Sequence, residues 1–283
     1  HQIIMKFPPF LIKRYVSNDT AKNMQRVLTD AKIHTVCEHA QCPNKFECFS
    51  RNHVTFMILG KYCTRTCAFC GVEKQAPEAL DPDEVFPIAQ AVKKLGLIHV
   101  IITSVTRDDL KDGGAGQFIR VMKSIREISR DIIIEILVPD FQGDFQVIEQ
   151  FKDAPPDIFG HNIETVPRLY KLLRPEADFH RSLKVLSFAG KSGLSTKSGF
   201  MLGLGEENQE VIDLLSALYR TGCRRITIGQ YLKPRGVSYQ VKRFVHPDEF
   251  QEYKRIAEGM GFEHVASGPF VRSSSIQTEY HRP

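Results

Sequence analysis

The segment VTFMILGKYCTRTCAFC, residues 54–70, joins an apolar run to three closely spaced cysteines. The run from Val54 to Leu59 is apolar nearly throughout, which is typical of a parallel strand that is buried on both faces. Cys63, Cys67 and Cys70 follow it directly. In parallel α/β folds the reactive groups lie at the carboxyl ends of the strands, so this segment predicts a functional loop after a first strand.

Similar runs continue along the chain and are separated by apolar residues at helical spacing. The predicted strands are Val54 to Leu59, His99 to Thr103, Ile132 to Val138, Ile158 to Ile163, Thr196 to Leu204, and Arg225 to Gln230. The helical patterns are Val85, Ile88, Ala89 and Val92; Phe118, Val121, Met122 and Ile125; and Val211, Leu214, Leu215 and Leu218. Six βα units predict an α/β fold, as either a doubly wound sheet or a partial barrel.

Composition limits the class of protein. The chain has 283 residues, 42% of them hydrophobic, which is enough to bury a substantial core. Its formal charge of +5 is too small for a dedicated nucleic-acid binder. No run is long and apolar enough to span a membrane, and the N-terminus lacks a secretory pattern. We therefore expect a cytoplasmic protein that binds neither nucleic acid nor membranes.

Six of the seven cysteines form two triplets: Cys37, Cys42 and Cys48, then Cys63, Cys67 and Cys70. A long chain with this composition needs no disulfide scaffold, so the triplets indicate metal binding. The second triplet suits a [4Fe–4S] cluster with one open iron, because such clusters prefer thiolate ligands. A zinc site completed by His53 or His161 is the alternative. Cys223 is expected to be an ordinary buried thiol.

The two ends of the chain do not follow the βα rhythm. Residues 1–52 are predicted to be an N-terminal extension, with a helix over Asp19 to Ala31 and a cysteine-bearing loop over Thr35 to Ser50. Residues 53–261 form the predicted core. Residues 262–283 are a predicted C-terminal tail that contains Arg272-Ser-Ser-Ser275.

The spacing CxxxCxxC after the first strand resembles that of the radical S-adenosylmethionine (SAM) superfamily. The first triplet has the spacing CxxxxCxxxxxC, and together with the terminal Arg-Ser-Ser-Ser it is similar to the lipoyl synthase family. The resemblance covers roughly residues 35 to 276. Supporting segments are Thr103 to Leu110, Asp112 to Ala115, His161 to Val166, Ser198 to Glu206, and Gly229 to Leu232.

This resemblance implies a partial (β/α)6 TIM-type barrel in which the Cys63, Cys67 and Cys70 cluster binds SAM through its open iron. Cleavage of SAM would then give methionine and a 5′-deoxyadenosyl radical. Further contacts to the cofactor are expected from Phe69, Ser104, Asn162, Glu164 and Arg174, and Arg107 and Asp108 are weaker candidates.

The resemblance also implies an auxiliary [4Fe–4S] cluster on Cys37, Cys42, Cys48 and a tail serine. Ser274 is the expected ligand and Ser273 the next candidate. Because a serine oxygen is a harder donor than thiolate, this corner can release its iron. The extension and tail are expected to become ordered only when the cluster joins them.

The implied reaction inserts two sulfur atoms, at C6 and C8 of a protein-bound octanoyl-lysine, and consumes the auxiliary cluster. The implied partners are an octanoylated lipoyl carrier domain or glycine-cleavage H protein, and an electron donor such as ferredoxin or flavodoxin. Three alternatives stay open at this point. A methylthiotransferase would be expected to add an RNA- or protein-binding module, a two-cluster electron carrier would use four cysteines per cluster, and a zinc protein would have no redox role.

Overall fold

A seven-stranded parallel sheet forms the centre of the computed structural model, which describes residues 7–13 and 18–275. The strands lie in sequence order, each paired with the next. They are β1 Thr55–Ile58, β2 His99–Ser104, β3 Ile133–Leu137, β4 Ile158–Gly160, β5 Thr196–Leu202, β6 Arg225–Gln230 and β7 His264–Gly268. The order begins at β1 and ends at β7, so the described residues form an open, partial barrel.

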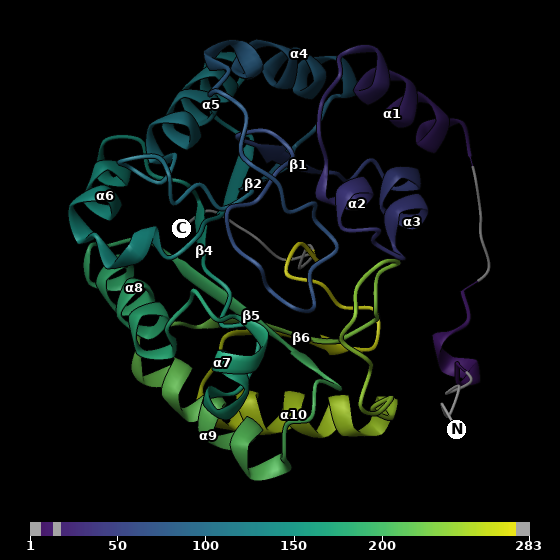
Figure 1. The fold of residues 1–283 in the computed structure, drawn as a ribbon. Coiled ribbons are helices and arrows are strands. Elements are labelled where there is room, and N and C mark those ends of the chain that lie inside the picture. Colours follow the sequence, from purple (N-terminus) through teal and green to yellow (C-terminus); the bar gives the residue numbers. More distant parts are fainter. Residues whose placement is uncertain (1–6, 14–17, 276–283) are drawn as a thin grey trace.

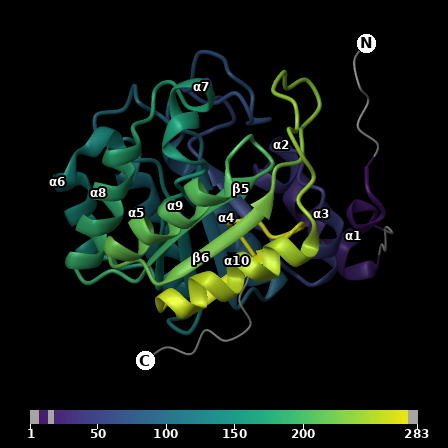
Figure 2. The same ribbon diagram turned by 90° about the horizontal axis from the view of Figure 1, so that it is seen from below.

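Helices cover the outside of this sheet (Figure 1). They are α4 Val85–Leu95, α5 Ala115–Ile128, α6 Phe145–Glu149, α7 Tyr170–Leu173, α8 Phe179–Lys191, α9 Asn208–Arg220 and α10 Pro247–Met260. The apolar residues predicted at helical spacing in α4, α5 and α9 are all buried. Asp178 caps α8 by accepting a hydrogen bond from the Arg181 amide at 2.6 Å, and Gly96 ends α4 with a φ of 60°. Figure 2 shows α10 along the outside of the sheet near β6.

Each strand presents one row of side chains to the helices and the other to the barrel interior. In β3, Ile134 and Ile136 belong to the buried cluster that packs against the helices, whereas Leu137 lines the internal cavity. Deeper in the barrel, the Lys197 ammonium pairs with the Glu135 carboxylate at 2.6 Å, and both are buried. This ion pair fills the barrel toward the amino ends of the strands, so the cavity lies at their carboxyl ends.

The N-terminal extension packs at the β1 edge of the open barrel. It contains α1 Asp19–Asp30, α2 Val36–His39 and α3 Lys45–Ser50. Thr35 forms an isolated antiparallel bridge with Phe56 of β1. The Asn44 amide donates to the Phe270 carbonyl at 2.6 Å, which joins the extension to the segment after β7. Figure 1 shows α2 and α3 beside β1, close to the C-terminal segment.

The α/β fold, the six predicted strands and the first helix are confirmed, but two details differ from the sequence-based expectation. The stretch from Thr35 to Ser50 is not only a loop, because it contains α2 and α3. A seventh strand, β7, lies within residues 262–283, which were predicted to be a tail. Only Gly268 of β7 is fully buried, so this edge strand carries no apolar run for a sequence pattern to detect.

Two further expectations concern single features. Cys223 is completely buried and its thiol donates to the Arg225 carbonyl, as expected of a structural cysteine. Burial raises the pKa of this thiol to about 11. Over the described ranges 7–13 and 18–275, none of the helices has the length and apolar character needed to cross a bilayer.

Candidate functional site

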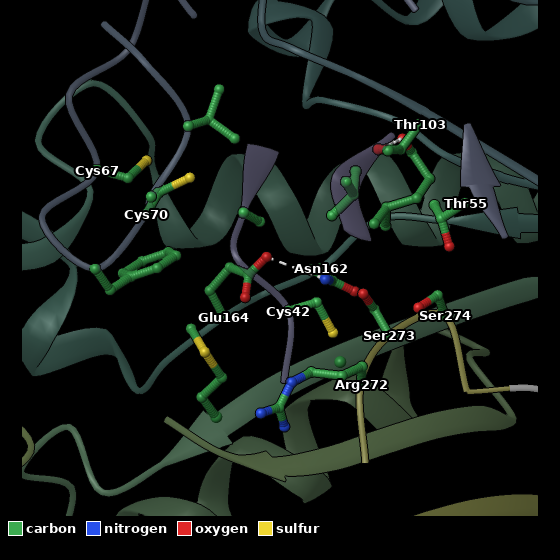
Figure 3. A pocket seen from close by; sticks show the side chains of 18 of the residues that line it. Cys42, Thr55, Cys67, Cys70, Thr103, Asn162, Glu164, Arg272, Ser273 and Ser274 are labelled. Carbon is green, nitrogen blue, oxygen red and sulfur yellow. Dashed lines mark hydrogen bonds between the residues drawn. The ribbon is translucent and has the colours of Figure 1, made fainter. Parts of the chain in front are cut away.

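Cys42 of the first triplet, the whole second triplet and the segment after β7 line one cavity of about 350 Å³ at the carboxyl ends of the strands. Its wall includes Cys42, Cys63, Cys67, Cys70, Ser273 and Ser274. In Figure 3, Cys67 and Cys70 lie at one side of the view and Ser273 and Ser274 at the other, with Cys42 and Glu164 between them. Cys42 and Ser274, which are 232 residues apart in the sequence, therefore face a common space.

The Cys63–Cys70 loop leaves β1 through two residues with left-handed backbones, Leu59 at φ 68° and Gly60 at φ 86°. Its backbone is then held by distant carbonyls, because the Cys63 amide donates to Glu73 at 3.0 Å and the Ala68 amide to Leu173 at 2.8 Å. The pKa of the Cys70 thiol is raised to about 12, mainly by burial and with contributions from the neighbouring thiols Cys67 and Cys63. The three sulfur atoms are thus close enough to interact.

The first triplet forms a second group of interacting thiols. Cys37 lies on α2, Cys42 in the following loop and Cys48 on α3. Burial raises the pKa of Cys37 to about 12 and that of Cys48 to about 11, and Cys42 contributes to both shifts. All seven cysteines are free thiols. Among the described residues no group of three His, Cys, Asp or Glu side chains is arranged to hold a single metal ion.

The tail reaches the cavity by crossing β6 at Gly229. A Cβ atom at Gly229 would lie 2.2 Å from the Val271 carbonyl oxygen, so only glycine allows this approach. Ser275 closes a turn, since its hydroxyl accepts a hydrogen bond from the Arg272 amide and its own amide donates to the Arg272 carbonyl, both at 2.8 Å. Of the three tail serines, Ser273 and Ser274 line the cavity, while the Ser275 hydroxyl serves the turn.

Three buried polar atoms in the cavity wall have no hydrogen-bond partner within the protein: Ser104 Oγ, His161 Nε2 and Arg174 Nε. A buried polar group without a partner is costly, so these atoms are available to bond a polar ligand or water in the cavity. SAM, with its amino, carboxylate, hydroxyl and purine nitrogen atoms, offers such partners. The wall therefore fits the cofactor that the cysteine spacing implies.

His161 also has a defined hydrogen-bonding role. Its Nδ1 lies 2.9 Å from the Val138 carbonyl, and a carbonyl requires a donor, so Nδ1 carries the proton and Nε2 is an acceptor. Burial lowers the pKa of His161 to about 4, which keeps the ring neutral.

Asn162, Glu164 and Arg174 form a polar group on the wall. The Asn162 amide donates to the Glu164 carboxylate at 3.0 Å (Figure 3). Glu164 has a φ of 67°, in the left-handed region that is uncommon for residues other than glycine. Burial raises the pKa of the Glu164 carboxyl, and the nearby Arg174 guanidinium opposes that shift. Arg174 is held by the carbonyl of Ile163 at 3.1 Å and the hydroxyl of Tyr170 at 3.0 Å.

The structure brings all the expected cofactor contacts to the cavity, Phe69, Ser104, Asn162, Glu164 and Arg174. The weaker candidates Arg107 and Asp108 do not line it. Arg107 pairs with Asp109 at 2.8 Å, and Asp108 pairs with Arg65 at 2.7 Å. Arg65 and the cavity-lining Arg272 were not identified from the sequence, and His161 was considered only as a zinc ligand. An arginine between two cysteines carries no spacing signal.

Comparisons with known proteins identify the family of this chain. Residues 57–218 match the radical SAM superfamily. The chain is 48% identical to a lipoyl synthase of Caldicellulosiruptor saccharolyticus, over 97% of both chains. It is 49% identical to a lipoyl synthase of Acidithiobacillus ferrooxidans, over 94% of this chain and 85% of that one.

Two solved structures share the fold at low sequence identity. One is SuiB of Streptococcus suis bound to S-adenosylmethionine, with a TM-score of 0.58, 12% identity, and coverage of 79% of this chain and 53% of that chain. The other is HydG, a maturase of the [FeFe]-hydrogenase, with a TM-score of 0.58, 13% identity, and coverage of 88% of this chain and 68% of that chain.

Proposed function

Because the chain belongs to the lipoyl synthase family of radical SAM enzymes, we propose that its two cysteine triplets hold two [4Fe–4S] clusters with unequal roles. The enzyme converts an octanoyl group on a protein substrate into a lipoyl group and uses SAM and iron–sulfur clusters to do so.

The first assignment is the SAM-binding cluster on Cys63, Cys67 and Cys70. Three thiolates leave one iron without a protein ligand, which provides the position where SAM binds. When bound, the reduced cluster supplies the electron that cleaves SAM to methionine and a 5′-deoxyadenosyl radical. The support for this assignment is that the three thiols line the cavity beside atoms that are available to bond a polar ligand.

The residues around that position orient the cofactor. Phe69 supplies an aromatic face for the adenine, and Asn162 and Glu164 contact the ribose or the amino group. Arg174 is held in place by Ile163 and Tyr170, and its free Nε would be available to pair with the carboxylate of bound SAM. Ser104 supplies the remaining unpaired hydroxyl.

The second assignment is the auxiliary cluster on Cys37, Cys42, Cys48 and Ser274. It is supported by the approach of the tail to the first triplet, since Arg272 and Cys42 line the same cavity and interact electrostatically. This cluster is proposed to be the sulfur donor and to be consumed. The bond between the serine oxygen and its iron would break first, because oxygen is a harder donor than thiolate.

The cavity also suits an extended hydrocarbon chain. Its wall is largely apolar between the two triplets and includes Val36, Met57, Leu137, Phe200 and Met201. An octanoyl chain buried there would hold C6 and C8 between the site of radical formation and the sulfur donor, and the walls would exclude water from the carbon radicals.

The partners follow from this chemistry. The proposed substrate carrier is a lipoyl carrier domain or a glycine-cleavage H protein, and the proposed electron donor is a ferredoxin or flavodoxin. Thiol-ligated clusters and seven free cysteines favour a reducing compartment, so we place the reaction in the cytoplasm. The core, residues 53–261, would hold SAM, while the extension, residues 1–52, and the tail, residues 262–283, would supply the auxiliary ligands.

The observation that carries this proposal is that Cys42 of the first triplet, all three cysteines of the second triplet and the tail serines line one cavity. The test is anaerobic reconstitution with iron and sulfide counting and an octanoyl-lysyl peptide as substrate. We expect about eight irons for two cubes. Cys67→Ala should bind about four and release no 5′-deoxyadenosine, and Cys42→Ala should bind about four and still release it.

Cys223→Ala is the matched control, because this buried cysteine lies outside the cavity, and it should keep both clusters and full product formation. About four irons in the wild-type protein, or no 5′-deoxyadenosine with dithionite as reductant, would overturn the assignment.

A further inference from the structure

The three residues between Cys63 and Cys67 are each bonded to a segment far away in the sequence. Thr64 binds the end of β2, since its amide and hydroxyl both donate to the Thr106 carbonyl, at 3.0 and 2.9 Å. The Thr64 hydroxyl also accepts from the Asp108 amide at 3.1 Å. Thr66 donates from its amide, at 3.2 Å, and from its hydroxyl to the Glu176 carboxylate. Nothing in the cysteine spacing requires these bonds.

Arg65 makes the strongest of these contacts. Its side chain is only 4% exposed and lies between two carboxylates. Nε and Nη2 donate to the two oxygens of Asp108 at 2.7 and 2.9 Å, and Nη2 also donates to Asp140 at 2.6 Å. Asp108 follows β2 and Asp140 follows β3, so Arg65 ties the cysteine loop to two adjacent strand ends.

Asp140 extends this network to α8. Its carboxylate is completely buried, and its second oxygen accepts from Arg181 Nε at 2.8 Å. Burial alone would raise the pKa of Asp140, but the hydrogen bond and charge of Arg65 outweigh burial and bring the pKa to about 2. Arg181 in turn donates to the Glu176 carbonyl at 2.8 Å. Because the Glu176 carboxylate binds Thr66, the network returns to the residue beside Arg65 and forms a closed ring.

We propose that Arg65 is a positioning residue that holds Cys63 and Cys67 at the geometry needed for cluster binding before any iron is present. This inference rests on the proposed cluster assignment for that loop. The two thiols flank Arg65 by two residues on either side, so fixing its guanidinium at both carboxylates restricts the backbone that carries both sulfurs. The buried guanidinium is bidentate to the partly buried Asp108 and also bonded to the buried Asp140, so it resists rotation in a way that a lysine could not reproduce.

The experiment measures amide hydrogen exchange in the iron-free full-length protein, comparing wild type with Arg65→Met and Arg65→Lys. The reporter amides are Thr64, Thr66 and Ala68, which are bonded to Thr106, Glu176 and Leu173. In Arg65→Met we expect these amides to exchange at least about tenfold faster, because a charge-assisted bond network is lost. In Arg65→Lys the exchange rates of these amides should lie between those of the wild type and Arg65→Met, because lysine keeps the charge and loses the bidentate geometry.

Two controls separate this effect from general unfolding. The Met57 amide of β1, bonded to the His34 carbonyl, should exchange at the same rate in all variants. Arg168→Lys removes another bidentate pair, with Glu210, that is exposed and distant from the loop, and it should leave the reporter amides unchanged.

Reconstitution with iron and sulfide supplies a second measurement. If Arg65 had only a structural role, its replacement would not alter how the loaded cluster responds to SAM. We expect Arg65→Lys to load both clusters but to show a changed electron paramagnetic resonance spectrum on addition of SAM and a KM for SAM raised more than kcat is lowered. Unchanged exchange of all three amides in Arg65→Met would overturn the inference. Wild-type protein that fails to bind iron would instead overturn the cluster assignment, whatever the exchange rates.

Discussion

At the scale of single residues, the tail serines differ in what their hydroxyls already do. The Ser275 hydroxyl accepts a hydrogen bond from the Arg272 amide and shapes the turn. Ser273 and Ser274 line the cavity. Because Ser275 does not line the cavity and its hydroxyl is placed in the turn, the structure favours the two serines that face the cavity over Ser275.

Ser274→Ala is predicted to release 5′-deoxyadenosine at close to the wild-type rate and to form no lipoyl product. The physical reason is that the SAM-binding cluster uses other ligands, whereas the auxiliary cluster loses its oxygen donor. Product analysis by mass spectrometry with an octanoyl-lysyl peptide measures both outcomes.

Ser273→Ala is the matched control, since it removes the adjacent cavity-lining hydroxyl and should leave sulfur insertion intact. Normal product from Ser274→Ala together with its loss in Ser273→Ala would assign the ligand to Ser273.

At the scale of elements, β6 and β7 determine where the tail can run. The two strands pair in parallel register from Arg225 with His264 to Gly229 with Gly268. Val271 then returns across Gly229 at a distance that leaves no room for a Cβ atom. The glycine is therefore required by the approach of another backbone segment and not by its own φ angle.

Gly229→Ala is predicted to displace the segment after β7. We expect proteolytic cleavage of the tail to become several-fold faster and lipoyl formation to fall, because the overlap with Val271 can be relieved only by moving the backbone. Limited proteolysis of the reconstituted protein, with fragment masses, gives the cleavage rate.

Gly259→Ala serves as the comparison, because a Cβ at this α10 position meets no atom within 4 Å and an alanine favours the helix by about 0.5–1 kcal/mol. If the two variants are cleaved at equal rates, Gly229 does not hold the tail.

At the scale of the whole molecule, the N-terminal extension contacts the segments that follow β6 and β7. Asn44 bonds to Phe270, and the Gln41 amide group bonds to the Arg235 backbone, accepting at 2.8 Å and donating at 3.4 Å. These contacts are few and lie partly at the surface. The auxiliary cluster would be bound both by cysteines of the extension and by a serine of the tail. Iron binding and the packing of the extension should therefore be coupled.

The extension is accordingly predicted to be protected by iron. Cleavage within residues 19–50 should be at least about tenfold slower in reconstituted protein than in iron-free protein, because a ligand that binds only the packed state stabilises it. Limited proteolysis followed by mass spectrometry measures these rates, with cleavage within α5 as the internal reference that iron should not affect. Equal cleavage rates in the two forms would show that the extension packs without the cluster.

Much of this organisation follows from local sequence. A run such as Arg225 to Gln230 is recognisable because strand and helix patterns repeat over a few residues, and Cys63 to Cys70 indicate a cluster because the ligand spacing is equally local. The first triplet and the terminal serines required the resemblance to a family, since no local rule connects residues 42 and 274.

Only the tertiary structure decided which distant groups meet. It added β7, whose residues carry no apolar pattern because it is a half-buried edge strand. It showed that Asp108 pairs with Arg65 and does not line the cavity, and that the Ser275 hydroxyl accepts a hydrogen bond within a turn. The reason is physical: chain periodicity depends on which face of an element is buried, whereas hydrogen bonds and ion pairs between distant segments depend on atomic distances that exist only after the sheet has curved and the ends have packed.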